Sequence, residues 1–162
     1  MSSRLRLTAA CLAVCAAACS DAPTAPDRDL IVTTAGPVRF RAGEVTSVEV
    51  TATNNSKSRT YQIAVSGCED PFTVTTAAGV TLPAAARVCT LAAYPPRPLP
   101  PGQSLTLSRD WVGDVGVAGS NGVAALLPPG TYVVRGFVRV VNGASGTTVA
   151  SNGPLTTEVL AR

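Results

Sequence analysis

The five cysteines are the residues of this chain with the most specific chemistry, because a thiol can carry a lipid, form a disulfide or bind a metal. Cys11, Cys15 and Cys19 lie in the alanine-rich first 20 residues, whereas Cys68 and Cys89 lie far downstream. The 162-residue chain contains no histidine, so it lacks the usual general base and the commonest metal ligand. No Ser-His-Asp or Cys-His set can be assembled, and we expect a protein that is not an enzyme and uses no cofactor or metal.

The first 18 residues have the pattern of an export signal. A short basic start, MSSRLR, precedes a mostly apolar segment over residues 7–18. This segment is well short of the roughly 17 to 25 residues that a membrane-spanning helix needs. Ala16, Ala17 and Ala18 then supply the small residues that a signal peptidase requires. We therefore predict that residues 1–18 are a signal peptide.

Cys19 follows this alanine run directly. The stretch resembles a bacterial lipobox, in which the cysteine thiol takes a diacylglyceryl group and becomes the new N-terminus after cleavage. Ala16 stands where lipoboxes prefer leucine; Cys15 is a poorer candidate because the bulky Val14 precedes it, and Cys11 comes too early. We predict that Cys19 carries the lipid, the alternative being ordinary cleavage that leaves Cys19 as a free terminal thiol.

The segment after the cleavage site is polar and broken by prolines. Residues 19–28, CSDAPTAPDR, have the composition of a tether that holds a folded domain away from a membrane. This predicts a membrane as a partner and the bacterial cell envelope as the location, facing the periplasm or the surface. Because Arg4 and Arg6 lie in the leader, eleven basic and ten acidic residues remain, which gives no electrostatic reason to expect nucleic-acid binding.

Two cysteines remain once the leader is removed and Cys19 is assigned to lipid. In an exported protein, a remaining pair favours a disulfide, here between Cys68 and Cys89. Two buried free thiols or half of a metal site are the alternatives. A metal site is disfavoured because the chain has no histidine and no CxxC pair.

Two acidic pairs could in principle serve catalysis or bind a cation. Glu69 and Asp70 are adjacent, so on a strand they would point to opposite faces, and we expect them to decorate a turn. Asp110 and Asp114 lack the regular acidic spacing of a calcium loop, and we expect solvated loop charges. We expect Trp111, which they flank, to fill the core rather than to form an exposed ligand platform.

From residue 29 onward the chain has the pattern of short strands separated by turns. Apolar and polar residues alternate in VTSVEVTAT, YQIAV and LTL, as in strands with one buried face. The β-branched run over residues 131–141 is the strongest strand signal, and Gly136 lies in its middle, where a bulge or a close neighbour is expected. We predict one domain, residues 29–162, folded as an immunoglobulin-like antiparallel β-sandwich of about seven to nine strands, with a small barrel as the alternative.

The proline-rich segment YPPRPLPP, residues 94–101, is the candidate contact segment. Its prolines favour an extended polyproline II conformation, stiff enough to present side chains to a partner. Tyr94, Arg97 and Leu99 are therefore candidate partner-binding residues. The alternative is a proline-rich crossover between sheets that needs no partner.

Four segments in order resemble the BsuPI domain family, the intracellular proteinase inhibitors of bacilli. They are VTATNNS, YQIAVSGCEDPFTVTTAAG, PPGQSLTLSRDW and LPPGTYVVRGFV, and together they cover roughly residues 45–141. The resemblance implies an immunoglobulin-like sandwich that binds a proteinase or another protein. The chain departs from the family in its export leader, in Cys68 and Cys89, and in residues 80–89, VTLPAAARVC, which replace an aromatic cluster.

These features combine into one functional prediction. We expect a lipid-anchored envelope protein with a non-catalytic, protein-binding β-sandwich, with proteinase inhibition as one form of that binding. The alternative is a structural or accessory envelope lipoprotein that has no enzyme target.

Overall fold

The computed structural model describes residues 28–87, 94–118, 123–142 and 145–161, which form strands and loops without a helix. The predicted signal peptide, Cys19, the tether before residue 28 and Cys89 lie outside the described residues. Eight strands have four residues or more: β1 (Leu30–Ala35), β3 (Thr46–Asn54), β4 (Tyr61–Ala64), β5 (Phe72–Thr76), β7 (Ser104–Trp111), β10 (Gly130–Asn142), β11 (Ser145–Ala150) and β12 (Leu155–Leu160). Four shorter strands have three residues each: β2 (Arg39–Arg41), β6 (Arg97–Leu99), β8 (Asp114–Gly116) and β9 (Ala124–Leu126).

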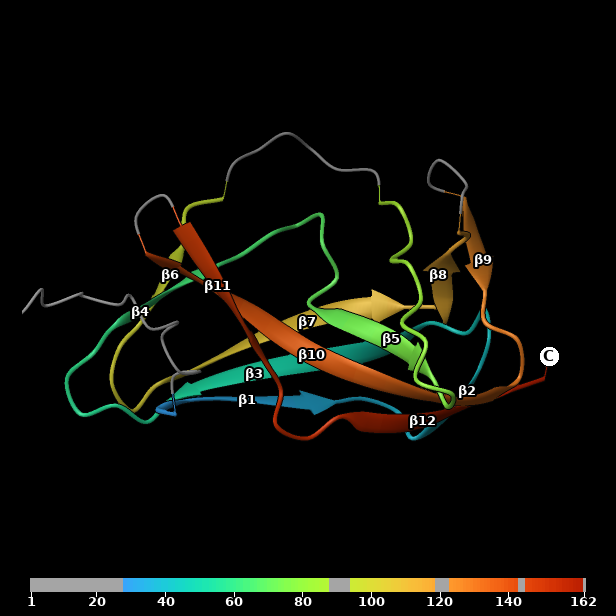
Figure 1. The fold of residues 1–162 in the computed structure, drawn as a ribbon, viewed down its shortest axis with the longest axis horizontal. Coiled ribbons are helices and arrows are strands. Elements are labelled where there is room, and N and C mark those ends of the chain that lie inside the picture. The colour runs from blue at the N-terminus through green and yellow to red at the C-terminus, as the bar shows by residue number, and fades with distance from the viewer. Residues whose placement is uncertain (1–27, 88–93, 119–122, 143–144, 162) are drawn as a thin grey trace, which may run out of the picture.

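The strands form the predicted immunoglobulin-like antiparallel β-sandwich. One sheet has the order β1-β3-β7, and the second, larger sheet is built around β10. Figure 1 shows β10 crossing in front of β3 and β7, so that the two sheets lie face to face. All strand pairs among the described residues are antiparallel except β2 with β12, and β8 and β9 form a small separate hairpin.

Strand β10 is long enough to pair with two strands along each edge. Its first half pairs with β12 and β5, and its second half pairs with β11 and β4. The chain leaves this sheet over residues 65–71, between β4 and β5, and returns when the amide of Phe137 donates to the carbonyl of Pro71. This excursion forms one wall of the groove described below.

The core lies between the sheets and has two parts. In one part, Trp111 is 1% exposed and its ring packs against Phe40 and Phe72, with centroid distances of 5.2 and 5.5 Å. In the other, Ile63 packs among apolar residues of both sheets, including Val50. The predicted core position of Trp111 is confirmed. The alternating burial along β10 follows from its strand geometry, since successive side chains point to opposite faces.

Candidate protein-binding groove

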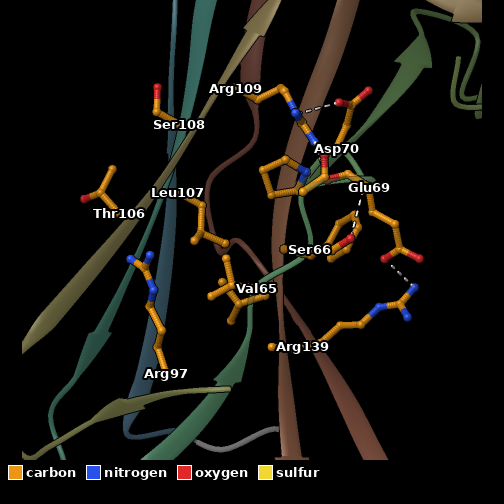
Figure 2. Close-up of a pocket in the computed structure, with 15 residues that line it drawn as sticks. Val65, Ser66, Glu69, Asp70, Arg97, Thr106, Leu107, Ser108, Arg109 and Arg139 are labelled. Atoms are coloured by element: carbon orange, nitrogen blue, oxygen red, sulfur yellow. Dashed lines mark hydrogen bonds and ion pairs between the residues drawn. The ribbon is translucent and has the colours of Figure 1, made fainter. Parts of the chain in front are cut away.

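A groove of about 460 Å³ opens along one side of the sandwich, where the two sheets do not meet. Its walls are Ala64 at the end of β4, residues 65–67 and 69–71 of the loop that follows, residues 106–109 of β7, residues 137–139 of β10, and Arg97 of β6. Figure 2 shows Val65 and Leu107 extending into the space between these walls, with Thr106 and Ser108 on the other side of β7.

The groove is open because β7 is the last strand of its sheet. Within the described ranges, β7 pairs with β3 alone, over residues 104–111, and no strand covers its other edge. On the facing side, residues 65–71 have left the second sheet. The backbone of β7 is therefore accessible along the groove.

The floor of the groove is apolar and only partly covered. Val65, Leu107 and Phe137 are half-buried, whereas Val138 beside them is buried. In Figure 2, Val65 and Leu107 point toward each other from opposite walls. These side chains offer apolar area to a partner that reaches between the walls.

Arginines line the rim. The Nε of Arg109 lies 3.0 Å from a carboxylate oxygen of Asp70, and an Nη of Arg109 donates to the carbonyls of Gly67 and Glu69 at 2.9 and 3.2 Å. Arg139 pairs with Glu69 at 3.2 Å, and both side chains are about half exposed. The side chain of Arg97 is exposed and has no ion-pair or hydrogen-bond partner in the part of the chain that the structure describes. Among the arginines that line the groove, Arg97 is thus the one whose charge is available to a binding partner.

Behind the wall, Arg87 bridges two carboxylates. Its guanidinium lies 3.1 Å from Asp70 and 3.0 Å from Asp114, whose side chains are 7% and 12% exposed. Burial lowers the pKa of Arg87, but hydrogen bonds to Asp70 and the charges of both carboxylates outweigh this and raise it above its ordinary value. The bridge attaches the 65–71 segment to β8.

The expectation of solvated loop charges is therefore wrong for Asp114. Asp70 lies in the loop between β4 and β5, off any strand, but its carboxylate points inward to Arg87 and Arg109 instead of decorating a turn. Asp114 is also mostly buried against Arg87, whereas Asp110 is exposed on β7. The sequence offered one usable signal, since Arg87 stands alone in the otherwise neutral run VTLPAAARVC and had no assigned partner.

The proline-rich segment is placed differently from the prediction. Arg97–Leu99 form an edge strand paired with β4, rather than an extended segment held away from the fold. An edge position tolerates Pro98, which has no backbone N–H. Leu99 lies opposite Tyr61 and is 2% exposed, so the prediction that Leu99 meets a partner is wrong: the pairing with β4 turns its side chain into the core.

Tyr94 and Arg97 keep the exposure that partner binding requires. Tyr94 is 53% exposed. Its ring covers Gly67, since a Cβ placed on Gly67 would lie 3.3 Å from the ring. Both residues therefore lie beside the groove, Tyr94 against its loop wall and Arg97 on its lining.

The cysteine predictions extend beyond the described residues. Cys68 lies in the 65–71 segment and is partly buried. Cys89 and Cys19 fall outside the described ranges, so the disulfide and the lipid attachment stay predictions. Across the described ranges there is no group of three or more potential metal ligands, and no helix long and apolar enough to cross a membrane.

Comparison with known proteins gives only distant structural likeness. No family model and no annotated protein sequence matches the chain. A β-glucosidase from Listeria innocua aligns with 75% of the chain at 19% identity and a TM-score of 0.37, and its complex with isofagomine aligns at a TM-score of 0.35. The chain spans only 15–16% of the length of these enzymes. At such scores the likeness carries no argument about activity.

Proposed function

We propose that this chain is a lipid-anchored envelope protein whose non-catalytic sandwich binds another protein through the groove beside β7. The observation that carries the proposal is the combination, in one groove and within the described part of the chain, of an uncovered strand edge, an apolar floor and an Arg97 side chain without a counter-ion. Uncovered edges of this kind are the surfaces to which extended protein segments add. The absence of histidine from the sequence supports a binding role over a catalytic one.

The lipid anchor is supported by the sequence around Cys19. Replacing Cys19 with serine removes the thiol that would take the diacylglyceryl group, so the processed protein should leave the membrane fraction. Membrane retention of a processed Cys19→Ser protein would contradict the anchor. The intact mass of the wild-type protein extracted from membranes reports the cleavage site and the acyl chains together.

The Cys68–Cys89 disulfide belongs to the same proposal. It would close a loop of 22 residues, from 68 to 89, and the chain-entropy model assigns such a loop on the order of 3 kcal/mol. The same intact mass should rise by about two hydrogens after reduction. An unchanged mass would show that the pair is reduced in the native protein.

Proteinase inhibition is the specific form of binding that the BsuPI resemblance supports. The membrane-extracted chain, held in mild detergent, should be incubated with serine proteinases of several specificities. Inhibition at micromolar concentration, without cleavage of the chain, supports this form. If none is inhibited and the chain stays intact, inhibition is rejected while binding of other proteins is still open to test.

A structural or accessory lipoprotein without a protein target is the competing function. A photo-crosslinking amino acid at Tyr94, beside the groove, separates the two. A discrete adduct in intact cells is expected from position 94, with none from the matched exposed position Val38. Equal labelling from both positions, or none from either, would favour the competing function.

A further inference from the structure

We propose that the groove binds an extended, acidic peptide segment that adds as a strand to β7. This inference rests on the proposed protein-binding function and specifies its partner. It follows from three properties of the groove: backbone polarity, side-chain spacing and charge.

The first property is a row of backbone groups that have no partner among the described residues. The amide of Asn54 donates to the carbonyl of Gln103 at 2.9 Å. Together with the register of β3 and β7, this bond shows which residues of β7 have their backbone groups facing β3. Hydrogen bonding alternates along an antiparallel pair, so the backbone groups of Leu105 and Leu107 face β3. Those of Thr106 and Ser108 face the groove, where an added strand can bond to them.

The second property is the spacing of the floor. Leu107 points inward, while its neighbours Thr106 and Ser108 point outward and bond across to β3 through their hydroxyls, at 2.9 and 2.8 Å. A strand added beside β7 continues this pleat, so every second side chain would enter the groove above Leu107 and Val65. Those inward side chains must be apolar to match the floor.

The third property is an excess of positive charge. The groove lining contains Arg97, Arg109 and Arg139 against Glu69 and Asp70. The last two arginines are paired with these acids, which leaves Arg97 without a counter-ion among the described residues. A carboxylate on the partner would complement this charge, and a partner lysine would be repelled.

A second copy of the chain is a less suitable occupant. If two β7 strands paired with each other, the outward face of the new ladder would carry mainly the hydroxyls of Ser104, Thr106 and Ser108, and the inward face would carry Leu105, Leu107 and the cation Arg109. The only carboxylate in β7 is Asp110, near its C-terminal end. Such a pairing would offer Arg97 little complementary charge, so the experiment treats self-association as a contradictory outcome.

Three fluorescent nonapeptides test the proposal by anisotropy with the full chain in mild detergent. The first alternates valine with glutamate, the second alternates valine with lysine, and the third repeats the first with every backbone nitrogen methylated. We expect saturable binding of the acidic peptide, and binding at least about tenfold weaker for the lysine peptide because one charge contact is lost. The methylated peptide should not bind, because it has no N–H for the ladder.

Two variants place the peptide on β7. Arg97→Glu changes an exposed residue. It should weaken binding of the acidic peptide about tenfold and strengthen binding of the lysine peptide. Thr106→Pro removes a backbone N–H that faces the groove and should abolish binding, while the β3 ladder keeps its bonds. Thr51→Ala on β3 is the matched control, because it removes the same hydroxyl contact with Thr106 from outside the groove and should bind the peptide normally. Circular dichroism shows whether each variant is folded.

Each contrary result overturns a defined part of the proposal. Equal binding of all three peptides would reject both recognition by charge and strand addition. If Arg97→Glu had no effect on binding, recognition by charge would be rejected. No binding of any peptide would reject the groove as a peptide site, and a β7-dependent dimer in sedimentation would assign the edge to a second copy. If none of the peptides binds but the photo-crosslinker at position 94 still forms its adduct in cells, the protein-binding function is retained. Only the assignment of an acidic peptide as the partner is then wrong.

Discussion

The backbone amide of Gly136 donates a 2.8 Å hydrogen bond to the hydroxyl of Thr34, across the interface between the two sheets. The sheets can approach closely here because Gly136 has no side chain. A Cβ at this position would lie 2.6 Å from a methyl of Val50 and 2.7 Å from the Thr34 hydroxyl. The close neighbour expected from a glycine in the middle of a strand is confirmed.

Gly136→Ala should destabilise the protein by about 1–3 kcal/mol, because the new methyl group forces β10 away from β3 or displaces Val50. Urea unfolding followed by the fluorescence of Trp111, the only tryptophan, measures this change. Gly153→Ala is the control, since a Cβ there meets nothing within 4 Å. Equal stability of the two variants would contradict the close packing at Gly136.

Arg87→Met should lower the free energy of unfolding by roughly 2–4 kcal/mol. The change keeps the side-chain length but leaves Asp114 mostly buried without the cation that pairs with it. Glu158→Gln is the control, because it breaks an ion pair with Arg39 in which both side chains are substantially exposed, and should cost less than about 1 kcal/mol. Equal losses in urea unfolding would show that the Arg87 bridge contributes no more than a surface pair.

Asn54→Asp should cost about 1–3 kcal/mol at neutral pH. The buried amide of Asn54 donates to the carbonyls of Arg59 and Leu99 at 2.7 and 2.8 Å, and a carboxylate would present only acceptors to both. The adjacent Asn55→Asp makes the same chemical change at an exposed position and should be nearly neutral. Thermal unfolding compares the two, and similar melting temperatures would contradict the role of the Asn54 amide.

Tyr132 should make stability fall at alkaline pH. Its hydroxyl donates to the carbonyl of Pro128 at 3.0 Å, and burial raises the pKa of Tyr132 above its ordinary value of 10.0. The folded protein therefore holds this proton to higher pH than the unfolded chain does. The contribution is complete below about pH 10 and is lost as the pH rises toward and through the folded pKa.

Tyr132→Phe tests this directly. At pH 7 the free energy of unfolding of the variant should be about 1 kcal/mol lower, because the hydrogen bond to Pro128 is lost. Between about pH 9 and 11 the stability of the variant should decline less than that of the wild type. Urea unfolding at several pH values measures both effects. Parallel pH profiles for the two proteins would contradict the contribution of Tyr132.

Local sequence patterns were sufficient to predict the class of fold and the buried faces of the main strands. Alternation in VTSVEVTAT and in residues 131–141 is a local property, because side chains of a strand alternate whatever it pairs with. For the same reason the burial of Trp111 and the close contact at Gly136 could be predicted. The predicted export signal is equally local, since such a signal is read along the chain before folding.

Only the tertiary structure decided which strands are neighbours, and with that the groove. Leu99 was expected at the surface, but pairing with Tyr61 turned it inward. Asp114 was expected in solvent and Asp70 on a turn, but Arg87, distant in sequence, forms one buried bridge with both carboxylates. The groove exists because β7 ends its sheet while residues 65–71 leave theirs. Such pairings join residues far apart in the chain, so no local pattern contains them, whereas the alternation of each strand depends on its own backbone alone.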